Sequence, residues 1–203
     1  MTEGYIKFNC TWQQEEIQIQ EELVRTLESE RSRLYQLGLI GMYPDGIGFG
    51  NISVRTEKGK SFLITGSATG QFTNLSQSQY SLVTGYNFKQ NHISCTGLTK
   101  ASAESLTHAA IYKSLPEVGA VVHVHCLWLW EKLMKVYPTT SIKIEYGTPE
   151  MALAVQKLAS SIKMNDEKII VMGGHPEGIL AFGNNLNEAT EQIIKIYNNY
   201  QND

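Results

Sequence analysis

The segment 118–124 is the feature of this sequence that most limits its fold. It is rich in valine and is interrupted only by Gly119, Ala120 and His123. A run of β-branched residues without polar alternation is typical of a central strand that is buried on both faces. Such a strand must be covered by other elements on both sides. Because helical and strand-like segments also alternate along the chain, the sequence predicts a layered α/β domain.

Helical and strand-like segments alternate along the rest of the chain, in agreement with this fold class. We expect helices where apolar residues recur every three or four positions, and strands in short β-branched runs. The predicted helices are 13–37, 102–115, 127–136, 149–161 and 187–200. The predicted strands or extended segments are 52–55, 61–65, 118–124, 141–145, 168–172 and 178–182, with strands also favoured within 76–95. No repeat or linker divides the sequence, so residues 1–203 are expected to form a single domain.

The composition argues against several classes of function. Seventeen Lys and Arg against twenty Asp and Glu give a net charge of −3, so no nucleic-acid partner is expected. The apolar runs are far shorter than the roughly 20 residues of a membrane span, and the first residues lack a signal-peptide core. We expect a soluble, cytoplasmic protein without a membrane partner. Cys10, Cys95 and Cys126 have no paired spacing and are expected to be reduced thiols.

His123 and His125 stand at the end of the predicted central strand. Because strand side chains alternate with a period of two, both imidazoles leave the same face and can share one metal ion at about 2.0–2.1 Å. The pair can equally be two polar residues at a strand end, and the spacing alone does not decide between these readings. Cys126 is expected on the opposite face, as a core thiol.

Two further residues extend this pattern to a catalytic site. Glu104 is expected in the first turn of the helix 102–115, with Ser102 as its N-cap, and a helix–turn–strand hairpin can return it to the His pair. His175 lies in the glycine-rich turn GGHPEG, between the two last predicted strands, which are expected to form a hairpin. Three histidines with a nearby carboxylate are the pattern of a catalytic divalent metal site with one open position.

The two remaining histidines have weaker claims to a role. His108 follows Glu104 by four residues and shares its helical face, yet such a pair more often makes a hydrogen bond or a surface contact than a metal site. His92 lies in a polar segment and is expected in a solvated loop.

Two glycine-rich segments, 48–53 and 65–70, match neither a dinucleotide fingerprint nor a phosphate-binding P-loop. Taken singly, they are typical of tight turns between strands. Their open backbone N–H groups and hydroxyls also suit an anionic or polyhydroxylated ligand, and together with the His and Glu residues they indicate a pocket. The residues expected to contact that ligand are Asn51, Ser67, Thr69, Gly70 and Ser102.

The order of these motifs resembles that of the class II aldolase/adducin family over nearly the whole chain. The motifs are Gly50-Asn51-Ile52-Ser53, the Thr- and Gly-rich loop, Ser102-Ala103-Glu104, Val121-Val122-His123-Val124-His125 and a His in a Gly-rich hairpin. The resemblance implies a three-layer α/β/α domain around a mainly antiparallel central sheet. It also implies a divalent metal, usually Zn²⁺, on His123, His125 and His175, with Glu104 as acid/base, and a homotetramer with active sites near subunit contacts.

The sequence departs from the family pattern at two places. The acidic residue commonly follows two serines that help to bind phosphate, whereas here the segment reads Ser102-Ala103-Glu104. The third metal ligand is commonly followed directly by Gly, whereas here Pro176 and Glu177 stand between His175 and Gly178.

The resemblance implies a zinc-dependent lyase of the aldolase type that acts on a ketose or ketose phosphate. Such an enzyme cleaves a carbon–carbon bond through a metal-stabilised enediolate. Epimerisation, dehydration and decarboxylation share this intermediate, so these reactions remain alternatives. A metal-dependent hydrolase and a non-catalytic, adducin-like binding protein are two further alternatives. The presence of Glu104 together with all three histidines argues against the binding protein.

Overall fold

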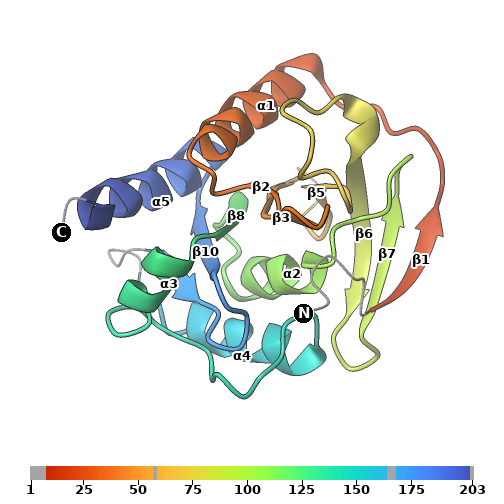
Figure 1. The fold of residues 1–203 in the computed structure, drawn as a ribbon. Coiled ribbons are helices and arrows are strands. Elements are labelled where there is room, and N and C mark those ends of the chain that lie inside the picture. Colours follow the sequence, from red (N-terminus) through yellow and green to blue (C-terminus); the bar gives the residue numbers. More distant parts are fainter. Residues whose placement is uncertain (1–7, 57–58, 164–167, 202–203) are drawn as a thin grey trace.

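An eight-stranded sheet forms the middle layer of the protein (Figure 1). The computed structural model describes residues 8–56, 59–163 and 168–201. The strands, in their order across the sheet, are β1 (Asn9–Gln13), β7 (His92–Thr96), β6 (Tyr80–Asn87), β5 (Phe62–Thr65), β4 (Asn51–Arg55), β8 (Ala120–His125), β10 (Gly178–Gly183) and β9 (Ile169–Val171). Neighbouring strands are antiparallel, except that β1 pairs with β7 in parallel. The mainly antiparallel sheet is therefore confirmed.

Helices cover both faces of the sheet. One layer contains α1 (Glu21–Gln36), α3 (Leu127–Leu133) and α5 (Leu186–Gln201), and in Figure 1 α1 and α5 lie side by side. The other layer contains α2 (Ser105–Ser114) and α4 (Pro149–Ala159), which pack against each other. The predicted three-layer α/β/α arrangement is confirmed. Among the described residues, no helix combines the length and the apolar character that crossing a membrane requires.

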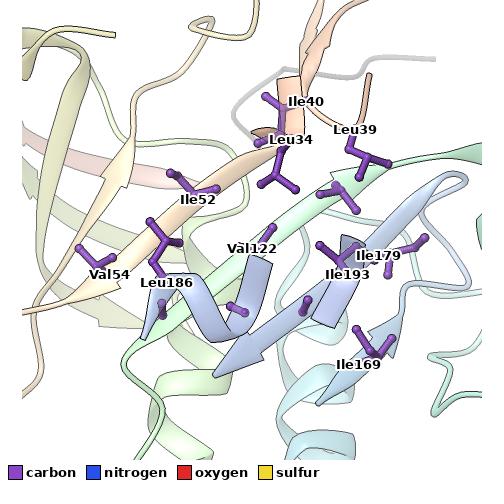
Figure 2. Close-up of a cluster of buried hydrophobic side chains, with 14 of the residues drawn as sticks. Leu34, Leu39, Ile40, Ile52, Val54, Val122, Ile169, Ile179, Leu186 and Ile193 are labelled. Atoms are coloured by element: carbon purple, nitrogen blue, oxygen red, sulfur yellow. The ribbon is translucent and has the colours of Figure 1, made fainter. Parts of the chain in front are cut away.

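Each face of the sheet has its own hydrophobic core. Figure 2 shows the core under α1 and α5, where Leu34 and Ile193 pack with Val122 of β8. Val121, one residue earlier on β8, belongs to the core under α2 and α4. Because side chains alternate along a strand, odd-numbered β8 residues face the α2 and α4 layer. His123 and His125 therefore point to that side of the sheet.

A small hairpin precedes β4 and forms a separate two-stranded sheet. Its two strands are β2 (Gly41–Met42) and β3 (Gly48–Phe49), joined by a turn in which the Tyr43 N–H donates to the carbonyl of Ile47 at 2.8 Å. The turn contains Pro44, Asp45 and Gly46, residue types that favour tight turns. A short 3₁₀ helix (Gln77–Gln79) directly precedes β6, which pairs with β5.

The predicted helix 13–37 begins too early, because α1 starts only at Glu21. Residues 9–13 instead form β1, whose end is fixed by the Trp12 indole N–H donating to the carbonyl of Gly97 at 2.8 Å. The Glu- and Gln-rich residues that follow β1 favour a helix locally. The side chain of Gln77 instead binds their backbone, accepting from the N–H of Ile19 at 3.3 Å and donating to the carbonyl of Ile17 at 2.6 Å.

The segment 141–145, predicted as extended, is a series of turns. The hydroxyl of Ser141 accepts from the N–H of Lys143 at 3.2 Å, and its carbonyl accepts from the N–H of Ile144 at 3.1 Å. Serine hydroxyls compete in this way with regular backbone pairing. This local hydrogen bonding explains why the segment does not form a strand.

The other predicted elements are confirmed with shifted ends. The strands 52–55, 61–65, 118–124, 168–172 and 178–182 correspond to β4, β5, β8, β9 and β10. The region 76–95 contains the 3₁₀ helix, β6 and most of β7. The helices 102–115, 127–136, 149–161 and 187–200 correspond to α2, a shorter α3, α4 and α5. The connection between β4 and β5 includes residues 57–58, which lie outside the described residues.

Candidate metal centre and ligand pocket

Strand β8 carries His123 and His125 to one end of the sheet. His123 lies between two neighbouring strands, opposite Asn51 of β4 and Leu180 of β10. The rings of the two histidines are edge to face with centroids 4.8 Å apart, and their Nε2 atoms are 2.9 Å apart. Both side chains are buried. The structure thus brings both rings to one face, as the two-residue spacing predicts.

His175 reaches this pair from the tight turn between β9 and β10. Its N–H donates to the carbonyl of Met172 at 3.0 Å, and its own carbonyl accepts from the N–H of Gly178 at 2.9 Å. Its ring centroid lies 5.1 Å from that of His123 and 4.8 Å from that of His125. Each histidine offers one ring nitrogen to a common point, and these three atoms lie within 4.8 Å of one another. The three side chains can therefore hold one metal ion.

The hydrogen bond of His123 shows which of its nitrogens faces the cluster. Nδ1 lies 3.2 Å from the carbonyl oxygen of Ile179, which can only accept, so Nδ1 carries the proton and donates it. Nε2 then keeps its lone pair, directed toward His125. A histidine that donates to a backbone carbonyl through one nitrogen and presents the other is the usual form of a metal ligand. This donor set fits a divalent ion.

The electrostatics of the cluster favour neutral imidazoles. Burial lowers the pKa of His123 well below its usual value, and the neighbouring histidines lower it further. Burial and the nearby His175 lower the pKa of His125 in the same direction. Both rings are therefore neutral at pH 7, which is the form that binds a metal.

Glu104 lies in the same pocket, at the N-terminal end of α2. One carboxylate oxygen, Oε2, accepts from the hydroxyl of Thr107 at 2.7 Å. The other, Oε1, is buried and has no hydrogen-bond partner among the described residues. Buried polar atoms are rarely left without a partner, and a bound ligand or an ordered water would complete this one. The carboxylate is thus fixed on one side and available to a bound molecule on the other.

The position of Ser102 differs from its predicted role as N-cap, because α2 begins at Ser105 and Glu104 occupies the N-cap position. Ser102 instead stabilises the turn before the helix. Its hydroxyl accepts from the N–H of Glu104 at 3.3 Å, and its carbonyl accepts from the N–H of Ser105 at 3.1 Å. This extra turn places Glu104 just outside the helix, and both residues line the pocket.

All other residues predicted to contact the ligand line this pocket as well. Asn51 projects from β4, and its buried Oδ1 has no hydrogen-bond partner within the described part of the chain. The hydroxyl of Thr69 turns back and donates to the carbonyl of Gly66 at 2.8 Å, so it shapes the loop 66–70. Ser67 lies in this loop and is half-buried. Their roles in binding remain predictions.

Gly70 allows the loop 66–70 to touch the β2–β3 hairpin. A Cβ atom at this position would lie 2.1 Å from the carbonyl oxygen of Gly41, which no side chain can tolerate. The contact holds the loop against the hairpin at the edge of the pocket. Glycine is therefore required here for close approach of two backbones, which is one of its usual uses.

The other two histidines lie outside the cluster. His108 is fully buried rather than on the surface, with Nδ1 2.7 Å from the hydroxyl of Ser53, and burial lowers its pKa to about 3. His92 begins β7 instead of lying in a loop, and its Nε2 is 2.9 Å from the hydroxyl of Thr11. The loop prediction for His92 is wrong because this residue pairs with Asn87 of β6 on one side and with Asn9 of β1 on the other.

The three cysteines are free thiols. Cys126 is half-buried at the edge of the core under α1 and α5, on the opposite side from the histidines. Cys10 and Cys95 lie side by side with their Sγ atoms 3.6 Å apart, although their spacing in the sequence gives no sign of it. Parallel pairing of β1 with β7 brings them together.

Four further residues belong to the site: Tyr43, Phe49, Tyr146 and Glu177. Phe49 and Glu177 lie in glycine-rich segments that the sequence points to, but no pattern predicts a role for any of the four side chains. Phe49 stacks on His125 with ring centroids 5.4 Å apart, and Tyr146 stacks on His175 at 4.3 Å. The hydroxyl of Tyr43 lies 2.9 Å from Nδ1 of His125 and donates to Glu177 at 2.5 Å. The Pro-Asp-Gly turn signal after Tyr43 predicts a local hairpin, but not its position above the histidines.

Solved structures with this architecture define the class of fold. L-fuculose-1-phosphate aldolase from Thermus thermophilus matches with a TM-score of 0.65 and 21% identity, over 87% of this chain and 90% of that chain. YgbL from Klebsiella pneumoniae matches with a TM-score of 0.66 and 20% identity, over 87% of this chain and 85% of that chain. At such identities the likeness shows the fold alone. That fold is the class II aldolase fold.

Sequence comparison identifies the family. The model of the class II aldolase and adducin N-terminal domain matches residues 43–201, so the chain belongs to the class II aldolase and adducin family. Methylthioribulose-1-phosphate dehydratase from Leptospira interrogans is 31% identical over 106 residues. This match covers 49% of the present chain and 43% of the relative, so it spans less than half the length of that relative.

Proposed function

We propose that this protein is a metal-dependent enzyme that converts a ketose or ketose phosphate through its enediolate, with aldolase-type cleavage of a carbon–carbon bond as the reaction. The observation that carries the proposal is the convergence of three buried imidazoles in one pocket with the open carboxylate oxygen of Glu104. We propose Zn²⁺ as the ion, because three neutral nitrogen ligands with an open position suit catalytic zinc. A homotetramer and a cytoplasmic location are proposals that rest on the family resemblance.

The metal ligands in this proposal are His123, His125 and His175. A divalent ion bound there supplies positive charge that polarises an oxygen of the substrate and stabilises negative charge on it. The remaining polar groups of the pocket orient the substrate. Asn51 offers its unpartnered amide oxygen to a hydroxyl group, and the loop 66–70 offers backbone N–H groups to an anionic or hydroxylated end.

Glu104 moves the proton in this proposal. In aldol cleavage it accepts the proton of the hydroxyl group β to the substrate carbonyl, the carbon–carbon bond breaks, and an aldehyde leaves. The bonding electron pair stays on the other fragment as the enediolate, to which a proton then returns. The fixed Oε2 and the open Oε1 suit this role, because an oriented carboxylate loses little freedom when it takes up the proton.

Dehydration is the second candidate reaction, and the similarity to a methylthioribulose-1-phosphate dehydratase favours it. In that reaction Glu104 takes the proton from the carbon next to the carbonyl, which leaves the enediolate. Glu104 then returns this proton to the hydroxyl group on the neighbouring carbon, and that group departs as water. The same pocket serves both reactions, since both pass through an enediolate. Epimerisation and decarboxylation are further alternatives within the family.

The experiment that tests the proposal uses a panel of ketose phosphates and unphosphorylated ketoses with the zinc-loaded protein. Release of an aldehyde supports cleavage, and a product lighter by one water supports dehydration. Incorporation of solvent deuterium next to the carbonyl supports the shared enediolate. Removal of the metal by a chelator should abolish all three signals, and adding Zn²⁺ back should restore them.

Two results would contradict the proposal. Hydrolysis of esters or phosphoesters without deuterium exchange would indicate a metal-dependent hydrolase, which needs only the ion and a bound water. Absence of stoichiometric metal, with no turnover of any sugar, would indicate a binding protein of the adducin type.

A further inference from the structure

We propose that Tyr43 and Glu177 are positioning residues that hold His125 in the tautomer able to bind the metal. The three residues come from distant parts of the sequence and meet beside the histidine cluster. Tyr43 belongs to the turn of the β2–β3 hairpin, and Glu177 to the turn between β9 and β10. The inference rests on the metal site of the proposed function and assigns that site two residues outside the ligand set.

The hydrogen bonds between these groups run in one direction. The hydroxyl of Tyr43 donates its proton to Oε2 of Glu177, 2.5 Å away, because a carboxylate oxygen accepts. The same hydroxyl oxygen lies 2.9 Å from Nδ1 of His125. Since its proton is committed to Glu177, the tyrosine oxygen acts as acceptor toward the ring. Nδ1 of His125 must therefore carry the proton and donate it.

This arrangement determines the state of the other ring nitrogen. A neutral imidazole with its proton on Nδ1 keeps a lone pair on Nε2. Nε2 of His125 lies 2.9 Å from Nε2 of His123, which also keeps its lone pair because Nδ1 of His123 donates to Ile179. Two lone pairs that face each other at this distance repel unless a cation lies between them. The Tyr43–Glu177 pair thus prepares His125 for a metal before the metal binds.

The backbone of Glu177 is a second, independent observation. Its φ angle is 73°, in the left-handed region that glycine adopts easily and a glutamate only with strain. Strained conformations of this kind persist where the side chain has a task and the surrounding structure fixes them. Here the carbonyl of Glu177 accepts from the N–H of Cys126 at 3.0 Å, which ties the strained residue to the end of β8. The side chain is thereby aimed at Tyr43.

The aromatic rings around His125 support the same orientation. Phe49 stacks on the His125 ring at an interplanar angle of 26°, and Tyr43 contacts Phe49 with ring centroids 4.5 Å apart. Stacking restricts the tilt of the imidazole, while the Tyr43 hydroxyl sets which edge of the ring faces the metal. The side chain of His125 is 2% exposed and that of Glu177 27% exposed, so the chain of hydrogen bonds leads from the buried ligand toward the surface.

The test measures metal affinity and the tautomer of His125 in the full-length protein. Zn²⁺ affinity is determined by competition with a chromophoric chelator. Tyr43→Phe keeps the ring and removes the hydroxyl, and we expect it to weaken Zn²⁺ binding by about 10–100-fold, as loss of a group that orients a metal ligand usually does. Glu177→Gly removes the carboxylate and also relieves the left-handed strain. We expect it to weaken Zn²⁺ binding while thermal stability is maintained.

Nitrogen NMR of the metal-free protein shows which ring nitrogen of His125 carries the proton. A purely structural role of Tyr43 and Glu177 would leave this proton position unchanged. In the wild type the proton of His125 should be on Nδ1. In Tyr43→Phe it should move to Nε2, from which it can donate to Nε2 of His123. Glu177→Gln retains an oxygen that accepts from the Tyr43 hydroxyl, so it should keep the Nδ1 proton and bind Zn²⁺ more tightly than Glu177→Gly. Matched controls are Tyr197→Phe, which keeps its ring contact with Trp128, and the exposed Glu131→Gln.

The outcomes separate this inference from the proposed function. If the wild type binds no Zn²⁺, the proposed function is wrong, and the tautomer measurement still decides whether Tyr43 and Glu177 control His125. If the wild type and Tyr43→Phe bind Zn²⁺ equally, or if both keep the Nδ1 proton on metal-free His125, the inference is overturned while the metal site stands.

Discussion

Asn51 on β4 and His123 on β8 face each other as direct partners in the antiparallel sheet. Partners across a sheet project from the same face, so the amide of Asn51 stands beside the first histidine of the cluster. Two paired strands in the middle of the sheet therefore hold a proposed ligand contact and a proposed metal ligand. Sites built on strands are more precise than sites on loops, which suits chemistry that requires a defined geometry.

Replacing Asn51 by Leu should weaken substrate binding more than catalysis. The amide oxygen has no hydrogen-bond partner among the described residues, so a bound hydroxyl group is its natural donor. If this contact is equally strong in the ground state and the transition state, KM rises and kcat changes little. Steady-state kinetics on a confirmed substrate provide the measurement. An unchanged KM would remove Asn51 from the binding site.

Replacing His123 and His125 by Ala should abolish metal binding. The wild type should hold about one divalent ion per chain, since the three ring nitrogens converge on one point. Elemental analysis of the purified proteins measures this directly. His108→Ala is a suitable comparison, because His108 lies outside the cluster and should leave the metal content unchanged. Full metal occupancy in the double variant would show that the ion binds elsewhere.

Local patterns in the sequence predict much of this fold. The valine-rich β8 and its hairpin-forming neighbours β9 and β10 are recognisable because their residue types alone indicate buried strands. The start of α1 is not recognisable in the sequence, because the Glu- and Gln-rich residues before it also favour a helix. The backbone of this stretch is bound instead by the side chain of Gln77, which contacts Ile19 and Ile17 from 58 and 60 residues further along the chain. Single-sequence patterns carry no information about such contacts.

In the candidate site, too, local patterns predict some features, whereas others depend on contacts between residues far apart in the sequence. The two-residue spacing of His123 and His125 predicts their common face, and strand geometry makes the prediction sound. The contact between Tyr43 and Glu177 spans 134 residues and joins two turns, so no local period indicates it. The burial of His108 is likewise a matter of tertiary packing, since Ser53 and Tyr112 form a hydrogen-bonded group with it only when α2 lies on the sheet.

Arg31→Met should destabilise the protein and weaken substrate binding. The buried Arg31 guanidinium donates to the carbonyls of Thr69, Phe72 and Thr73 at distances of 2.7–3.3 Å, and so supports the loop that lines the pocket. Among these acceptors only the Thr69 carbonyl makes a fully buried bond, and a buried acceptor left without a donor costs about 1–3 kcal/mol. Urea denaturation should show a loss of about this size, and KM should rise because the loop loses its support.

The matched control for this prediction is Arg25→Met on the same helix. Arg25 forms an exposed ion pair with Glu21 at 3.0 Å, and such pairs contribute only about 0.3–0.5 kcal/mol. A similar loss of stability in both variants would mean that the contacts of Arg31 with the loop contribute no more to the free energy of unfolding than an exposed ion pair does.

His108 should make the stability of the metal-free protein depend on pH. Burial lowers its folded-state pKa to about 3, whereas in the unfolded chain the value is about 6.5. Between these values the unfolded chain binds more protons, so stability falls as the pH drops below about 6.5, by about 1.4 kcal/mol per pH unit. In His108→Gln this contribution is absent. Urea denaturation of both proteins at pH 7 and pH 5 measures the difference, and an equal pH dependence would contradict the prediction.

Glu104→Gln separates the catalytic role of this residue from a structural one. The amide keeps an oxygen for the Thr107 hydroxyl, so the local geometry should survive. A carboxylate at a helix N-terminus contributes about 0.3–1 kcal/mol through the helix dipole, and its loss should lower stability by no more than this.

If Glu104 moves the proton, the rate should fall by about 10²–10⁴-fold, because an amide cannot accept it. The measurement requires a confirmed substrate and equal metal content in both proteins, since loss of metal would also reduce the rate. A Gln variant within a few-fold of the wild type would show that another group moves the proton. Tyr146, which lines the same pocket and stacks on His175, would then be the residue to test.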